Sequence, residues 1–147
     1  MSDSTKNLAV TLFREILAVD QLARSHVARI LPKGMELSHF SVLNHLAHCG
    51  VERSPAQLAS TFHLTRGAMT NTLSKLEWAG WVHIRPDWED ARRKMISISP
   101  SGIAARDAAV SAIAPVIAEV VDTVGTEKVK IALPVLREMR MKLSKDE

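Results

Sequence analysis

The sequence predicts a mainly helical protein that carries one small β-hairpin. Apolar residues recur every three or four positions over most of the 147 residues. An apolar pattern with a period of two is confined to residues 81–85 and 95–98, and two short capped helices lie just before it. A chain of this length can bury a core without disulfides or a structural metal, so one domain is expected.

The first predicted element is a long helix that begins near Thr5 and ends at Leu31. Its apolar residues keep helical spacing: Leu8, Leu12, Ile16, Val19, Ala23 and Ile30. Residues 32–34, which are Pro, Lys and Gly, end it. A second helix begins after Ser38, a predicted N-cap, and ends at Gly50, which is expected to take the left-handed conformation.

Two short helices joined by a tight turn follow, and together they match the helix-turn-helix pattern. The first begins with a capping box that has proline at the first helical position: Ser54, Pro55 and Gln57. A break at residues 63–64 precedes the second helix, which Thr65 caps and Gly80 ends. The second helix is expected to bury one stripe of side chains: Met69, Leu73 and Leu76.

The hairpin comes directly after this second helix. Residues 81–85 and 95–98 alternate between apolar and polar, and the polar residues 86–94 join them. The pattern predicts a β-hairpin with a long charged tip, which in this position is the wing of a winged helix-turn-helix.

Two further helices complete the chain. Ser99 and Pro100 begin one that runs to Gly125, with a kink expected at Pro115, and Thr126 begins the other. The first and last helices are apolar along more than one stripe, and this surplus apolar surface must be covered. Folding back onto the same chain is one solution, but a symmetric homodimer is favoured. The expected domain is residues 1–147, with a winged-helix lobe at 37–99 and dimerisation helices in 1–36 and 100–147.

The positive charge of the chain is concentrated in its middle. The net charge is +3, from 19 Lys and Arg against 16 Asp and Glu. Residues 53–94 hold seven basic and four acidic side chains, whereas the segments on either side are neutral. A small basic region between neutral flanks indicates contact with a polyanion.

The second helix of the pattern has a polar face without acidic residues. That face comprises Arg66, Gly67, Thr70, Asn71 and Ser74. Arg can donate two hydrogen bonds to guanine, Asn can pair with adenine, and Thr or Ser can reach bases or phosphates. Gly67 and Ala68 allow close approach. An ordinary solvated helix face carries mixed Glu and Lys, and this face does not. Base recognition in the DNA major groove is therefore favoured over a merely solvated surface.

The hairpin tip, residues 87–94, supplies a second predicted contact. An arginine at a narrow tip can enter an A·T-rich minor groove, and Arg92 holds that position. Asp90 is expected to orient the Arg92 guanidinium or to tighten the turn. Trp88 is expected to brace the hairpin rather than pack against sugars. The acidic residues at 87, 89 and 90 must face away from phosphates or be paired.

In these motifs the chain resembles the MarR family of transcriptional regulators over essentially its whole length. The motifs are the helix-turn-helix core SPAQLASTFHLTRGAMTNTLSKLEWAGWV, an Asp-x-Arg wing at Asp90 and Arg92, and the strand-to-helix step ISISPSG. The wing departs from the family where Ala91 replaces a frequent glycine. The resemblance implies a homodimer built from the terminal helices, with a recognition helix at 65–79 and repression relieved by a ligand.

The sequence thus predicts a sequence-specific regulator of transcription that binds double-stranded DNA as a homodimer on a pseudo-palindromic operator. We expect it to act as a repressor. We also expect it in the cytoplasm, because no apolar run approaches the roughly 18 residues that would span a bilayer. The predicted DNA-binding residues are Ser54, Thr65, Arg66, Gly67, Ala68, Thr70, Asn71, Ser74, Lys75, Arg85, Asp90, Arg92, Arg93 and Lys94.

The resemblance also implies a small aromatic effector. Members of the family often bind such ligands where the dimer helices meet the DNA-binding lobe. At that junction the candidate residues in this chain are His26, His39 and Leu43. Ordinary packing is the alternative for each of them.

A metal-responsive or redox-responsive regulator is an alternative. His45 and His48 lie three positions apart on one helix, and Cys49 follows them. Without a nearby carboxylate or second cysteine, such a pair is usually a solvated face, so no metal or cofactor is expected. Cys49 has no resolving partner in this single-cysteine chain and is expected to be a buried, inert thiol.

Catalysis is not expected. The six glycines are never closer than 13 residues, which excludes a glycine-rich phosphate loop, and no HExxH or CxxC motif occurs. The chain has no tyrosine, and its histidines are scattered over helices. The last alternative is a winged helix that contacts only proteins, but such a module would lack the polar recognition face and the wing arginine.

Overall fold

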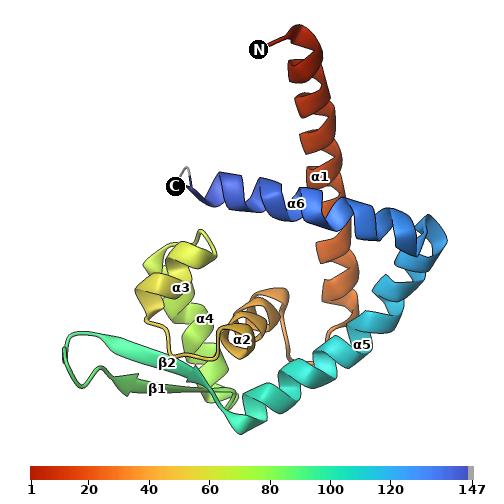
Figure 1. The fold of residues 1–147 in the computed structure, drawn as a ribbon. Coiled ribbons are helices and arrows are strands. Elements are labelled where there is room, and N and C mark those ends of the chain that lie inside the picture. The colour runs from red at the N-terminus through yellow and green to blue at the C-terminus, as the bar shows by residue number, and fades with distance from the viewer. Residues whose placement is uncertain (146–147) are drawn as a thin grey trace. The chain divides into compact units, whose positions relative to one another are not determined.

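The structure, a computed structural model, describes residues 1–145 (Figure 1). The elements in order are α1 (Asp3–Ile30), α2 (Leu37–Cys49), α3 (Pro55–Thr61), α4 (Arg66–Trp78), β1 (Val82–Pro86), β2 (Lys94–Ile98), α5 (Pro100–Val124) and α6 (Thr126–Lys145). The predicted fold class, mainly helical with one antiparallel hairpin, is confirmed. The chain divides into two compact units, one ending at Val110 and one beginning at Ser111. The predicted separation into a lobe at residues 37–99 and dimerisation helices on either side of it remains a prediction.

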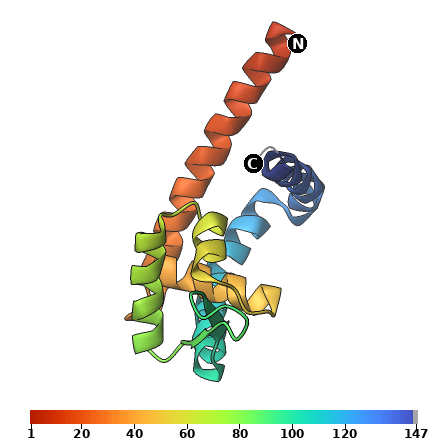
Figure 2. The same ribbon diagram turned by 90° about the vertical axis from the view of Figure 1, so that its left-hand side faces the viewer.

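Helix α1 begins two residues before the predicted start. The Ser2 hydroxyl accepts a hydrogen bond from the Thr5 amide at 3.2 Å, which caps the helix as serine commonly does. None of its 28 residues is buried. Figures 1 and 2 show its N-terminal half extending away from the lobe that α2, α3 and α4 form.

The predicted N-cap of the second helix, Ser38, is wrong. Helix α2 begins at Leu37, and Glu36 is the residue that precedes it. The Glu36 amide donates a hydrogen bond to Nδ1 of the His39 side chain at 3.1 Å. A histidine three residues into the helix therefore does what Glu or Gln does in the usual capping box, and this made the start hard to recognise. The predicted end is confirmed, since Gly50 is left-handed with φ 64°.

The helix-turn-helix forms as predicted. The Gln57 amide donates to the Ser54 hydroxyl at 3.2 Å, and the Ser54 amide donates to Oε1 of Gln57 at 2.9 Å. The turn contains His63 in the left-handed region, with φ 53°. Thr65 then caps α4 by accepting from the Ala68 amide at 3.1 Å. These bonds satisfy amides that a short helix leaves unpaired at its start.

The core of the lobe determines which side of α4 faces outward. The predicted stripe of Met69, Leu73 and Leu76 is buried, together with residues from the neighbouring elements. The other buried apolar residues are Met35, Val42, Leu43, Leu46, Leu58, Ala59, Val82, Ile96 and Ala109. Figure 2 shows α4 at the outer edge of this lobe. One side of α4 is therefore packed, and the other side faces solvent.

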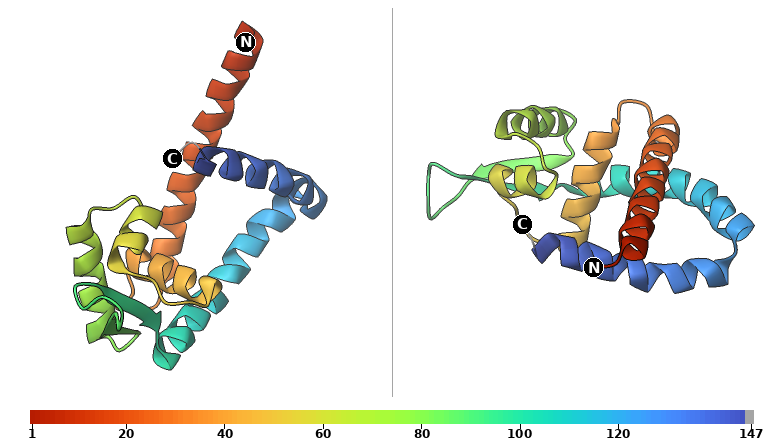
Figure 3. Two further views of the ribbon diagram at one scale, coloured as in Figure 1. Left: turned by 60° about the vertical axis from the view of Figure 1, so that its left-hand side comes forward. Right: turned by 90° about the horizontal axis from the view of Figure 1, so that it is seen from above.

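The wing is a two-stranded antiparallel hairpin whose pairs run from Val82 with Ile98 to Pro86 with Lys94. A third segment joins it, because Arg53 and Ile96 exchange two backbone hydrogen bonds of 3.0 and 2.7 Å. This pairing ties the α2–α3 loop to the middle of β2. Figure 3 shows the loop of the hairpin extending beyond the helices of the lobe.

The base of the wing is joined to the first turn of α5. Ser99 donates its amide to the Trp81 carbonyl at 2.9 Å and its hydroxyl to the Gly80 carbonyl at 2.6 Å. The same hydroxyl accepts from the Gly102 amide at 2.9 Å, which caps the helix. Buried Ser99 therefore links the end of α4, the hairpin and α5.

Large apolar side chains of the terminal helices are exposed in the single chain. On α1 they are Leu8, Val10, Leu12, Phe13, Leu17, Val19 and Leu22. Within residues 111–144 they are Val116, Ile117, Val120, Val124, Ile131, Leu133, Val135, Leu136, Met141 and Leu143. Helices α5 and α6 continue through Pro115 and Pro134. No single helix of the described chain is long and apolar enough to cross a membrane, although α5 and α6 together meet that test as a bent pair.

Candidate nucleic-acid interface

The outward side of α4 is polar and carries no acidic residue in its first turn. The predicted contact residues on this helix are all exposed: Arg66, Gly67, Ala68, Thr70, Asn71, Ser74 and Lys75. Thr65 is exposed as well, with its hydroxyl engaged in the cap. The free amides at a helix N-terminus favour negative charge, so this end of α4 suits a phosphate-rich partner.

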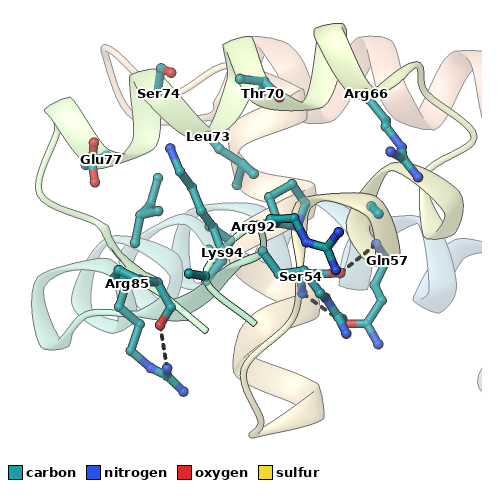
Figure 4. A pocket seen from close by; sticks show the side chains of 17 residues that line it. Ser54, Gln57, Arg66, Thr70, Leu73, Ser74, Glu77, Arg85, Arg92 and Lys94 are labelled. Atoms are coloured by element: carbon teal, nitrogen blue, oxygen red, sulfur yellow. Dashed lines mark hydrogen bonds between the residues drawn. The ribbon is translucent and has the colours of Figure 1, made fainter. Parts of the chain in front are cut away.

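A groove of about 820 Å³ separates α4 and the start of α3 from the wing. Eight of the predicted residues line it: Ser54, Arg66, Thr70, Ser74, Arg85, Arg92, Arg93 and Lys94. Figure 4 shows Arg66 on α4 and Arg92 on the wing with their guanidinium groups on the same side of the groove. Glu77 is the one acidic residue of the lining, and the sequence reasoning did not single it out.

The other six predicted residues do not line the groove. They are Thr65, Gly67, Ala68, Asn71 and Lys75 on the solvent side of α4, and Asp90 at the wing tip. Apart from Asp90, the predicted residues therefore lie on two surfaces, the outward side of α4 and the cationic groove beside it.

Asp90 organises the tip of the wing around Arg92. Its Oδ1 accepts from the Arg92 amide at 3.0 Å and from Arg92 Nε at 3.2 Å. Both expected effects, a tightened turn and an oriented guanidinium, are thus present. The Arg92 side chain is 92% exposed. Ala91 does not have a positive φ, so this turn forms without the glycine that the family often has.

The acidic residues of the tip are largely engaged with its own backbone. Oδ1 of Asp87 accepts from the Glu89 amide at 3.0 Å, and the Asp87 amide donates to the Arg93 carbonyl at 2.9 Å. Asp90 is held as described above, and Glu89 is exposed. The expectation that these carboxylates are paired is met for Asp87 and Asp90.

Arg85 has a different environment from the other cations of the wing. Its Nη2 donates to Oε1 of Glu52 at 2.7 Å, and its Nη1 donates to the Pro86 carbonyl at 2.8 Å. The hydrogen bond to Glu52 raises the pKa of Arg85. Its guanidinium carbon lies 3.8 Å from the centre of the Trp88 ring. Trp88 therefore braces the hairpin as predicted, and Arg85 is occupied by these partners.

Two further residues of this region need comment. Ser54 is only 5% exposed and its hydroxyl caps α3, so its predicted DNA contact remains a prediction from the sequence. Trp78 in the last turn of α4 is 94% exposed, and the sequence reasoning missed it. Helical spacing could have identified it, because Trp78 lies four residues after Ser74 and seven after Asn71.

The three candidate effector residues differ in environment. Leu43 is a fully buried core residue, and His26 is exposed on α1. His39 is buried with its ring edge-on to Trp81, and its Nε2 has no hydrogen-bond partner among the described residues. Burial lowers the pKa of His39, which favours the neutral ring. Of these three candidates, only His39 thus has a buried polar side-chain atom.

Two residues of the alternative metal or redox site, His45 and Cys49, contact neighbouring groups of the fold. Within residues 1–145 no three His, Cys, Asp or Glu side chains are grouped to hold a metal ion. The His45 ring packs edge-on against Phe62 at 5.6 Å, and burial lowers its pKa. The Cys49 thiol donates to the Leu46 and Val51 carbonyls. Cys49 is half-buried rather than buried as predicted, because it lies in the last turn of α2.

The fold and the site define a winged helix-turn-helix protein. Residues 33–93 match the sequence model of the MarR family, which confirms the resemblance noted in the sequence. No curated protein matches the chain in sequence.

Solved structures share this fold over most of the chain. The transcriptional regulator BldR from Sulfolobus solfataricus has a TM-score of 0.81 at 22% identity, covering 97% of this chain and 99% of its own. Wild-type apo MarR from E. coli has a TM-score of 0.77 at 22% identity, covering 87% and 96%. A mutant E. coli MarR complexed with operator DNA has a TM-score of 0.75 at 22% identity, covering 90% and 96%.

Proposed function

We propose that this protein is a transcriptional regulator that binds double-stranded DNA in a sequence-specific manner. The observation that carries the proposal is the pairing of a polar outward face on α4, whose first turn has no acidic residue, with an exposed, oriented arginine at the wing tip. The solved MarR complex with operator DNA, which has the same fold, supports it.

The proposed contacts follow from the geometry of the two elements. The 13 residues of α4 span about 20 Å, and an α-helix fits the DNA major groove. Arg66 and Asn71 would recognise base edges there, while Thr70, Ser74 and Lys75 would bind edges or phosphates. Arg92 at the wing tip would enter the adjacent minor groove. The groove between the two elements would then face the intervening sugar-phosphate backbone.

We propose further that the protein acts as a homodimer and represses transcription. The exposed apolar side chains of α1, α5 and α6 support the dimer, because a second copy would remove them from water. Two copies of α4 would then recognise two half-sites of a pseudo-palindrome. For the effector we propose a small aromatic molecule near His39, whose buried Nε2 lacks a partner among the described residues.

The proposal is tested by selecting bound duplexes from a randomised library with the purified protein at two salt concentrations. Phosphate contacts make affinity salt-dependent, whereas base recognition appears as enrichment of particular sequences. An enriched inverted repeat is the expected result. Salt-sensitive binding without enrichment would contradict sequence-specific regulation and favour a winged helix that contacts proteins.

Replacing Arg66 by alanine is expected to weaken binding to the selected site by about 1–3 kcal/mol and to relax the preference at one base position. The reason is the loss of two hydrogen bonds to one guanine edge. The measurement is fluorescence anisotropy on the site and on its single-base variants, with Arg29→Ala on α1 as the control of equal charge change. Equal loss on unrelated DNA would show that Arg66 binds only phosphate.

Replacing Arg92 by alanine is expected to weaken binding about fivefold to tenfold on sites with A·T-rich flanks, and less on G·C-rich flanks. The narrow minor groove of A·T-rich DNA has the stronger negative potential, so the loss of a cation matters more there. Titrations on two duplexes that differ only in their flanks provide the comparison. Unchanged binding to the A·T-rich duplex would remove the wing from the proposed interface.

A further inference from the structure

We propose that Glu52, Arg85 and Trp88 form a brace that positions the wing for DNA, so that Arg85 acts through the wing rather than by touching DNA. The inference rests on the proposed DNA-binding function and adds positioning residues to it. It assigns Glu52, an acidic residue beside a basic surface, a role that favours DNA binding.

The contacts of the brace lie at the junction between the strands and the tip. Arg85 is the fourth residue of β1, and its guanidinium is held by the Glu52 carboxylate at 2.7 Å and the Pro86 carbonyl at 2.8 Å. The Trp88 ring lies against the same guanidinium at 3.8 Å. The side chains of Arg85 and Glu52 are 29% and 34% exposed, so water screens this ion pair less than a fully exposed one.

The brace connects the wing tip to the body of the lobe. Glu52 precedes Arg53, whose backbone is paired with Ile96 in the middle of β2. The α2–α3 loop thus holds the hairpin at two points, at the middle of β2 through the backbone and at the end of β1 through Glu52. Beyond Pro86, the described hydrogen bonds of the tip join its residues only to one another, so Trp88 is the side chain that ties the tip to this support.

The side chains of Arg85 and Arg92 point in different directions, which separates the positioning role of Arg85 from the proposed DNA contact of Arg92. Figure 4 shows the Arg85 guanidinium pointing away from α4, whereas the Arg92 guanidinium lies over the groove with Arg66. Arg85 is occupied by Glu52 and Trp88, whereas the Arg92 side chain is 92% exposed. An exposed arginine loses less freedom on binding when the turn that carries it is already held in place. The brace therefore supports DNA binding by limiting the movement of the tip.

The decisive variant is Glu52→Gln, because the loss of a negative charge and the loss of the brace predict opposite changes in DNA affinity. Removing an acidic charge near DNA should strengthen binding through simple electrostatics. Loss of the brace should instead weaken binding to the A·T-flanked site about threefold to tenfold and reduce the preference for A·T flanks. Glu89→Gln, which makes the same charge change outside the brace, is the matched control and should bind as well as wild type or better.

Two further variants test the aromatic part and the folding of the protein. Trp88→Ala should resemble Glu52→Gln, and Trp88→Phe should retain most of the affinity because it keeps an aromatic face for Arg85. Circular dichroism and thermal unfolding of each variant establish that the lobe is folded. A general loss of stability would lower binding to both duplexes equally, so the flank preference is the readout that a purely structural role would not move.

The test is completed in a background that lacks the wing arginine. In Arg92→Ala protein, Glu52→Gln should cause no further loss of A·T preference, because the brace acts through that arginine. An undiminished effect in this background would overturn the inference, and so would a Glu52→Gln protein with wild-type affinity and flank preference. If Arg92→Ala alone weakens binding but the brace variants do not, only the brace fails. If Arg92→Ala has no effect, the proposed minor-groove contact fails first.

Discussion

Replacing Gly102 by alanine is expected to lower the free energy of unfolding by about 3 kcal/mol. A Cβ atom at this position would clash with the Trp81 carbonyl oxygen and lie 2.9 Å from Cγ1 of Ile98. The Trp81 carbonyl also accepts the Ser99 amide, so it cannot move without breaking the link between α4, the hairpin and α5. The gain in helix propensity from alanine, about 1 kcal/mol, is too small to offset this clash.

Urea unfolding followed by circular dichroism measures the effect, and Gly67→Ala is the matched control. Gly67 is also helical, but a Cβ there would meet nothing within 4 Å. Its replacement should leave stability unchanged or raise it by up to about 1 kcal/mol. A Gly102→Ala protein as stable as wild type would show that the wing and α5 pack less closely than the structure indicates.

The double substitution Leu12→Glu and Val19→Glu is expected to convert the proposed homodimer into a monomer. Both side chains are exposed on one stripe of α1, where a second copy would cover them. Burying two carboxylates from each protomer in an apolar interface is strongly unfavourable. Affinity for a full inverted repeat should then fall about 100-fold or more, because two half-sites are no longer bound together.

Sedimentation and light scattering give the oligomeric state, and circular dichroism shows whether the helices persist. Arg14→Glu, on the polar side of α1, is the control for a charge change on the same helix and should remain dimeric. Leu12→Ala is a milder variant, expected only to raise the dimer dissociation constant. If the double variant stayed dimeric, α1 would lie outside the interface.

The order and type of the elements were predictable because local chemistry determines them. Capping by Ser54 and Thr65 and the left-handed residue at Gly50 depend on neighbours within four positions. The prediction of Ser38 as the N-cap was wrong because the Glu36 amide at the start of α2 donates to the His39 side chain. The usual capping patterns do not include histidine at this position. Helix boundaries are therefore predictable only where the capping residues are the common ones.

The candidate site was predictable in its composition but not in its division of roles. Helical periodicity alone indicated that Arg66, Thr70 and Ser74 share the side of α4 opposite the core. The roles of Arg85 and Glu52 depend on a contact between residues 33 positions apart, and no pattern in the sequence connects them. Trp78 was overlooked because an apolar side chain is normally assigned to the core.

The sequence by itself thus determined the helix-turn-helix, the hairpin, the buried stripe of α4 and the Asp90–Arg92 turn, because each depends on short-range spacing. Only the tertiary structure decided which wing arginine keeps an exposed side chain and which is held against the body of the fold. Arg85 and Arg92 are both wing arginines in the sequence, yet one is held by Glu52 and Trp88 and the other is exposed. That difference arises from long-range packing, which brings the α2–α3 loop against the wing.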